Sequence, residues 1–105
     1  MEKDLINRAR KKDVQAISEI VQKTQRKAIY FAYKVVNDEA LAKDIVLQSY
    51  ILAFQNLDQL MDDGNFEHWF GRKVSEQLLN QIEYEKNSSL NSSFYVDEED
   101  RIEFD

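Results

Sequence analysis

The stretch LAKDIVLQSYILAF, residues 41–54, decides the fold predicted for this chain of 105 residues. It contains neither glycine nor proline, and its apolar or small residues recur at steps of three and four. That spacing places one inward stripe on a helix, formed by Ala42, Ile45, Val46, Ser49, Tyr50, Ala53 and Leu57. Asn37 and Asp38 are good capping residues, so we expect a helix from there to about Leu57.

Helices are also predicted on both sides of this stretch. A short helix is expected within residues 2–10, and Asp13 is a good N-cap for a long helix over residues 14–36. Its inward set is Ile17, Ile20, Val21, Thr24, Ala28, Phe31, Ala32 and Val35. After a turn at Asp62, Asp63 and Gly64, Asn65 caps a third long helix to about Tyr84, packed through Phe66, Trp69, Phe70, Val74, Leu78 and Ile82.

Composition supports an all-α fold with a single domain. The chain has no proline and only two glycines, which leaves few helix breakers. We predict a three-helix bundle with a short N-terminal helix over residues 1–86. Residues 87–105 are rich in serine, asparagine and acids, and are too poor in apolar side chains to repay the entropy of folding. They are predicted to form a flexible acidic tail.

Charge is distributed unevenly along the chain, whose net charge is -6. Residues 1–36 carry +5, whereas residues 37–86 and 87–105 carry -6 and -5. A surface that binds nucleic acid by phosphate neutralisation therefore has its cations only in the first third. The chain has no cysteine, no apolar leader and no run of about 18 apolar residues, so a cytoplasmic protein outside the membrane is predicted.

The outer side of the helix over residues 41–54 is unexpectedly apolar. Asp44, Gln48, Ile51 and Gln55 lie along one line, with Leu47 beside it. Two interpretations remain open. The apolar residues Leu47, Ile51 and Leu52 either pack on the short first helix or on the tail, or they belong to a protein-docking face.

Three pieces of the sequence resemble region 2 of sigma-70 factors of the extracytoplasmic-function type. The resemblance covers roughly residues 4–82 and includes the start KDVQA, the middle helix, and the segment FEHWFGRKV. The matching positions are Lys12, Asp13 and Ala16, then Ala42, Asp44, Ile45, Val46, Tyr50, Ile51, Ala53 and Phe54, then Phe66, Trp69 and Phe70. Many of these positions match only in their hydrophobic character.

The resemblance implies a function in transcription initiation. In that family the middle helix docks on the clamp helices of core RNA polymerase, which here gives a docking face of Asp44, Leu47, Gln48, Ile51 and Gln55. Asp44 takes the place of the family's docking acid. Lys43, Leu47 and Gln48 depart from the family, which has glutamate, glutamine and an acid at these positions.

The resemblance also implies contact with promoter DNA, through the third long helix. Phe66, Trp69, Arg72 and Lys73 are weak candidates for this contact, because the helical spacing of Phe66 and Trp69 favours core packing. The acids that surround Arg72 and Lys73 repel phosphate. We therefore expect promoter DNA to be bound weakly by the domain alone, or with the help of a partner.

Other residue types indicate no catalytic or metal chemistry. His68 has no second ligand at metal-binding spacing, and no nucleophile stands beside a base, so neither an enzyme nor a cofactor is predicted. The cluster Arg8, Arg10, Lys11, Lys12, Lys23, Arg26 and Lys27 is interpreted as a solvated helix face or as a site of non-specific nucleic-acid contact. The alternatives to a polymerase-docking module are a regulatory or partial factor that needs a second sigma-like or anti-sigma polypeptide, and an interaction adaptor that no longer reads DNA.

Overall fold

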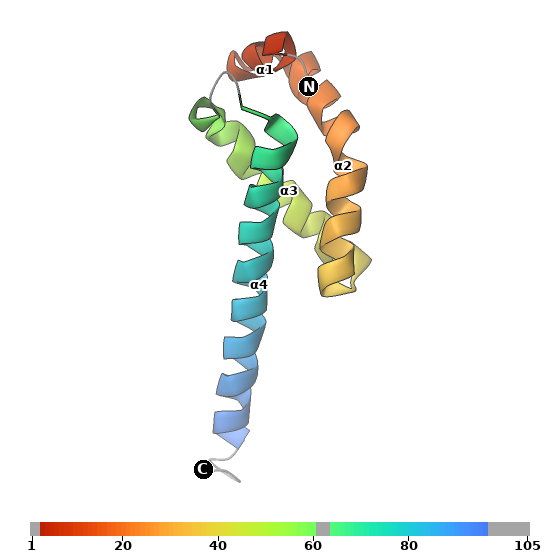
Figure 1. Cartoon of the computed structure of the whole chain (residues 1–105). Coiled ribbons are helices and arrows are strands. Elements are labelled where there is room, and N and C mark those ends of the chain that lie inside the picture. Colours follow the sequence, from red (N-terminus) through yellow and green to blue (C-terminus); the bar gives the residue numbers. More distant parts are fainter. Residues whose placement is uncertain (1–2, 61–63, 97–105) are drawn as a thin grey trace.

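The computed structural model describes residues 3–60 and 64–96, with side chains as far as Asn87. This part of the chain is helical and contains no strand, which confirms the all-α prediction. Its elements are α1 (Lys3–Arg10), α2 (Val14–Val36), α3 (Glu39–Gln55), a 3-10 turn η1 (Leu57–Gln59) and α4 (Phe66–Val96). Helix α3 packs against both α2 and α4, and the distal part of α4 projects away from the other helices (Figure 1).

Short polar side chains set the helix boundaries. The Asp13 carboxylate accepts hydrogen bonds from the amides of Gln15 and Ala16, at 3.0 and 3.3 Å. Helix α2 ends at Val36 and is capped by Asn37, whose φ of 56° is left-handed, and the Asp38 side chain then accepts from the amide of Leu41 at 3.0 Å. These contacts satisfy amides that have no partner within the helix. The predicted starts of α2 and α3 are thereby confirmed.

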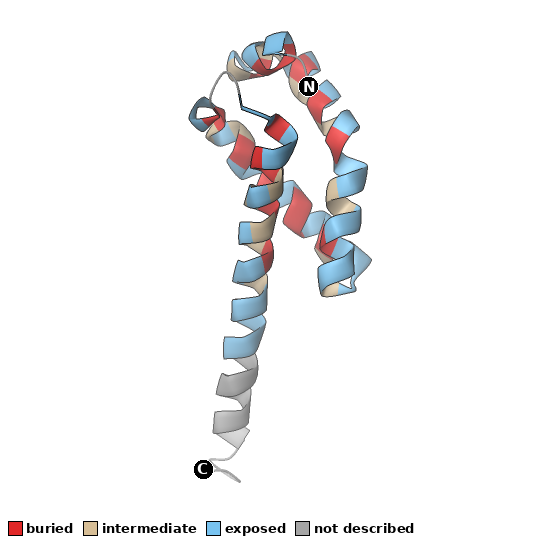
Figure 2. Cartoon of the chain, in the orientation of Figure 1, coloured by how far each residue is buried: buried red, intermediate tan, exposed pale blue. Residues whose placement is uncertain are grey.

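The core lies where α2, α3 and α4 meet (Figure 2). The whole inward stripe predicted for α3 is buried, together with Leu57 in η1. Aromatic rings fill the space between α3 and α4, and the Tyr50 and Phe70 rings stack with centroids 4.3 Å apart. Phe66 stacks in turn on Phe70 at 5.6 Å. Such stacked rings contribute packing energy beyond the area that they bury.

Three residues predicted to be inward are exposed instead, namely Phe31, Val35 and Ile82. Each continues the apolar period of its own helix, but helices that cross touch over only part of their length. The distal part of α4 is exposed on all sides from Ile82 to Asn87 (Figure 2). Periodicity therefore predicted the correct face of each helix. It overestimated how much of the length of that face is covered by other helices.

Helix α4 is longer than predicted. The amide of His68 donates to the Asn65 side-chain oxygen at 3.0 Å, as expected for a cap, but the helix continues past Tyr84 to Val96. No glycine or proline occurs between Arg72 and Val96 to stop it. Residues 87–96, predicted to belong to a flexible tail, are therefore helical instead. The turn residues Asp62 and Asp63, and residues 97–105 of the predicted tail, lie outside the described residues, and the domain boundary at residue 86 stays a prediction. No helix in the described ranges has the length and hydropathy needed to cross a membrane.

Candidate protein-docking site

The outward side of α3 is accessible. All five residues of the predicted docking face, Asp44, Leu47, Gln48, Ile51 and Gln55, are exposed. Leu47 is 55% exposed and Ile51 is 44% exposed. Because Leu52 is also exposed, the alternative in which α1 covers these apolar side chains is wrong. The alternative in which the tail covers them involves side chains after Asn87, which lie outside the described residues.

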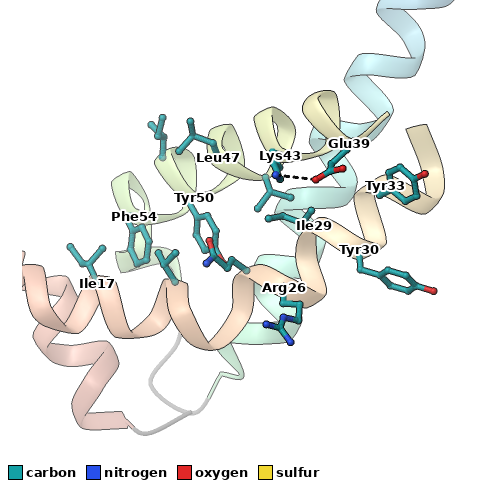
Figure 3. Close-up of a pocket in the computed structure, with 14 residues that line it drawn as sticks. Ile17, Arg26, Ile29, Tyr30, Tyr33, Glu39, Lys43, Leu47, Tyr50 and Phe54 are labelled. Atoms are coloured by element: carbon teal, nitrogen blue, oxygen red, sulfur yellow. Dashed lines mark ion pairs between the residues drawn. The ribbon is translucent and has the colours of Figure 1, made fainter. Parts of the chain in front are cut away.

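An open groove of about 950 Å³ runs between α2 and α3, and part of the docking face forms one of its walls (Figure 3). Leu47 and Ile51 line this groove, whereas Asp44, Gln48 and Gln55 lie outside it. Its other apolar residues include Ile17, Val21 and Ile29 of α2 and Val46 and Phe54 of α3. The predicted face is thus one lip of a larger apolar surface. Sequence reasoning missed the opposite wall, because a groove depends on how far apart two helices lie.

Charged side chains stand at the edge of the groove. The Lys43 ammonium lies 3.0 Å from the Glu39 carboxylate, one helical turn earlier (Figure 3). Lys43 is one of the departures from the sigma-70 pattern, and on this helix it neutralises a neighbouring acid. Arg26 lines the groove from α2 and takes part in no ion pair among the described residues. The groove therefore combines apolar walls with an unneutralised guanidinium.

Tyr50 connects the groove to the core. Burial raises the pKa of its phenol, and the hydrogen bond with Thr24 only partly offsets this effect. The two hydroxyl oxygens are 2.5 Å apart, and Thr24 also donates to the Ile20 carbonyl at 2.8 Å. The phenol is therefore neutral at physiological pH. Its role in the groove is structural rather than acid–base.

The aromatic candidates for nucleic-acid contact are core residues. Phe66 is 2% exposed and Trp69 is 8% exposed, so neither ring offers a free face to an unstacked base. Core packing, which the helical spacing of these two residues favoured, is therefore confirmed, and neither residue is available for stacking. Arg72 is exposed, whereas the Lys73 ammonium lies 5.1 Å from the centroid of the Trp69 ring and is half-buried.

Several of the N-terminal cations contact other parts of the chain. Arg8 donates to the Asp13 carboxylate at 2.9 Å, and this bond raises the pKa of the Arg8 guanidinium. The same bond, with the help of the Ala16 amide, lowers the pKa of Asp13. Arg10 donates to the Leu60 carbonyl. Arg8 and Arg10 thus hold α1 in place rather than forming an open basic surface.

Metal-binding geometry does not occur in the part of the chain that the structure describes. No group of three potential metal ligands gathers there, and His68 is exposed on α4. What the described surface does offer is an accessible apolar strip beside a groove, which suits the side chains of another helix. Comparisons with protein-family models, with curated proteins and with solved structures found no match.

Proposed function

We propose that this chain is a transcription-initiation module of the sigma-70 region-2 type, which docks on core RNA polymerase through the outward face of α3. The observation that carries the proposal is the exposure of Leu47 and Ile51 beside the α2–α3 groove. Apolar side chains of this size on a helix surface are typical of an interface when they lie together. The motif pattern supports the same face, because Asp44 is exposed while Ile45 and Val46 are buried.

The energetics suit a specific but modest contact. Fully burying one leucine or isoleucine side chain contributes about 1.5–3 kcal/mol. Two half-exposed residues therefore supply a few kcal/mol before the entropy of association is subtracted. The clamp helices of the polymerase present ridges of side chains, and a groove between two helices is the complementary shape.

Promoter DNA is proposed to be bound weakly or only with a partner. Arg72 is exposed on α4, but Glu67 and Glu76 are exposed on the same helix and repel phosphate. Lys73 is half-buried against the Trp69 ring, which makes its ammonium less accessible to phosphate. DNA contact through α4 would therefore depend on cations supplied by the polymerase or by a second polypeptide.

A pull-down with purified core RNA polymerase tests the docking proposal. The wild-type chain is compared with an Asp44→Arg, Ile51→Glu double variant. The matched control is a Glu83→Arg, Leu79→Glu double variant, which makes the same kinds of change at exposed positions of α4, outside the docking face. We expect polymerase to retain the wild type and the control but not the docking-face variant.

Each other outcome contradicts part of the proposal. If the wild type is not retained, docking on polymerase is wrong. If all three proteins are retained equally, the polymerase is bound by a different surface. Circular dichroism of each variant confirms that the helices are intact before binding is compared.

A second candidate function is that of an adaptor or partial sigma factor that binds another sigma-like or anti-sigma polypeptide. The substitutions on α3 favour it: Lys43 is paired with Glu39, and Leu47 and Gln48 replace polar or charged residues of the family pattern. Two results together would favour this candidate. The wild type would fail to bind polymerase, and it would bind such a purified polypeptide whereas the docking-face variant would not.

A further inference from the structure

The outward face of α2 is both basic and aromatic, and Tyr30 lies at its centre. On a helix, a residue has its surface neighbours three and four positions away. For Tyr30 these are Arg26, Lys27, Tyr33 and Lys34, so every one of them is cationic or aromatic. All five residues are exposed, and Tyr30 is 62% exposed. We call these five residues the basic–aromatic face.

The positive charge of this face is not neutralised within the described chain. Arg26, Lys27 and Lys34 form no ion pair with any described residue. On α2 and α3, Glu19 pairs with Lys23 at 3.3 Å and Glu39 pairs with Lys43. Glu67 of α4 lines a small pocket together with Lys27 and forms no ion pair with it, so it lowers the positive potential at that end of the face. The face therefore carries three cations in a chain whose net charge is -6.

The rings of this face are free to accept a planar partner. Arg26 and Tyr30 line the α2–α3 groove and project from α2 at its edge, whereas Tyr50 lies between α2 and α3 (Figure 3). The Lys34 ammonium lies 5.4 Å from the centroid of the Tyr30 ring, at a distance suited to a cation–π contact. The other side of the ring has no ring partner among the described residues.

We propose that the basic–aromatic face binds single-stranded nucleic acid. An unpaired base stacks on Tyr30, and Arg26, Lys27 and Lys34 contact the phosphates on either side. Exposed aromatic rings among cations are the combination that binds single strands without sequence preference. A duplex keeps its bases stacked and would use only the cations, and a segment made of acidic residues would likewise pair with the cations and leave the rings uncovered.

The size of the face limits the strength of binding. From Arg26 to Lys34 the helix rises about 12 Å, at 1.5 Å per residue. At roughly 3.4 Å per stacked nucleotide, this length accommodates about three nucleotides. Binding by one such short site is expected to be weak and to fall steeply with salt. Arg26, Tyr30 and Tyr33 also line the α2–α3 groove, so a protein that filled the groove would compete with the nucleic acid for these residues. Binding of an oligonucleotide by the chain alone does not require docking on polymerase.

The test is fluorescence anisotropy of a short labelled oligothymidylate with the whole chain, at low and at physiological salt. Tyr30→Ala is expected to weaken binding about fivefold or more, which is the lower end of the effect of losing one stacked base. Tyr30→Phe keeps the ring and is expected to bind as the wild type does. Arg26→Ala is expected to reduce the slope of log affinity against log salt by about 0.7.

Two matched controls lie on the exposed part of α4. Tyr84 is 67% exposed, and Lys86 is exposed beside it, so Tyr84→Ala and Lys86→Ala remove the same types of side chain elsewhere. Neither control is expected to change the affinity. Circular dichroism verifies that every variant keeps the helical content of the wild type.

Three results would overturn the proposal. The wild type could fail to bind the oligonucleotide at low salt, or Tyr30→Ala could bind it as tightly as Tyr84→Ala does. In the third case, polyglutamate displaces the oligonucleotide, and Tyr30→Ala changes the affinity for neither of these two ligands. That result would assign the cations to an acidic protein partner instead of a nucleic acid.

Discussion

The hydroxyl oxygens of Thr24 and Tyr50 lie 2.5 Å apart in the core, where α2 meets α3. Thr24 has a single hydroxyl hydrogen, and it donates this hydrogen to the Ile20 carbonyl at 2.8 Å. Tyr50 must therefore donate to Thr24. Because the Tyr50 ring also stacks on Phe70, this one side chain connects α3 to both of its neighbouring helices.

Removing the acceptor of this hydrogen bond is expected to destabilise the fold more than removing the donor. Thr24→Val leaves the Tyr50 hydroxyl buried without a partner, which costs about 1–3 kcal/mol. Tyr50→Phe removes the donor but leaves the Thr24 bond to Ile20 intact, so it costs about 1 kcal/mol. Urea unfolding followed by circular dichroism gives both values. The double variant should cost less than the sum of the two, and strict additivity would show that the hydroxyls do not interact.

Stability is expected to fall at alkaline pH through Tyr50. Burial raises the pKa of its phenol in the folded state, so above about pH 10 the unfolded chain loses this proton more readily than the folded chain does. The contribution of Tyr50 to the free energy of unfolding is fully present below the pKa of the phenol in the unfolded chain. It is lost as the pH rises towards the pKa of the phenol in the folded chain. Urea midpoints measured from pH 8 to pH 11 are expected to fall more steeply for the wild type than for Tyr50→Phe. Equal slopes would contradict this assignment.

The sequence predicted the α3 stripe correctly because α3 is packed along its length between two helices. In such a place the 3.6-residue period alone determines which side is buried. The same period failed at Phe31 and Ile82, which are exposed. Their burial would require a neighbouring helix at that height, and this depends on crossing angles that periodicity does not encode.

The candidate site was predictable only in part, for the same reason. Exposure of Leu47 and Ile51 follows from their position opposite the inward stripe of a single helix. The groove beside them depends on the separation of α2 and α3. The pattern of residues along one helix does not give the distance between two helices. The central position of Tyr30 is different, because its cationic and aromatic neighbours can be read from positions three and four away in the sequence.

Replacing Gly71 by alanine is expected to stabilise the protein. Gly71 lies within α4, and a Cβ atom built there has no atom within 4 Å outside its own helix backbone and chain neighbours. Alanine therefore fits without a clash and lowers the entropy of the unfolded chain. The gain in the free energy of unfolding should be about 0.5–1 kcal/mol, measured by urea unfolding. A loss of stability would show that α4 does not have this environment in solution.

Adjacent residues on α3 are expected to separate stability from docking. Val46 is buried and Leu47 is exposed, although they follow one another in the chain. Val46→Ala leaves a cavity in the core and should cost about 2 kcal/mol, whereas Leu47→Ala should change the free energy of unfolding by less than about 0.5 kcal/mol. Leu47→Ala should nevertheless weaken the retention of core polymerase, because it removes apolar surface from the docking face. If Leu47→Ala destabilises the fold as much as Val46→Ala does, Leu47 belongs to the core and the docking face must lie elsewhere.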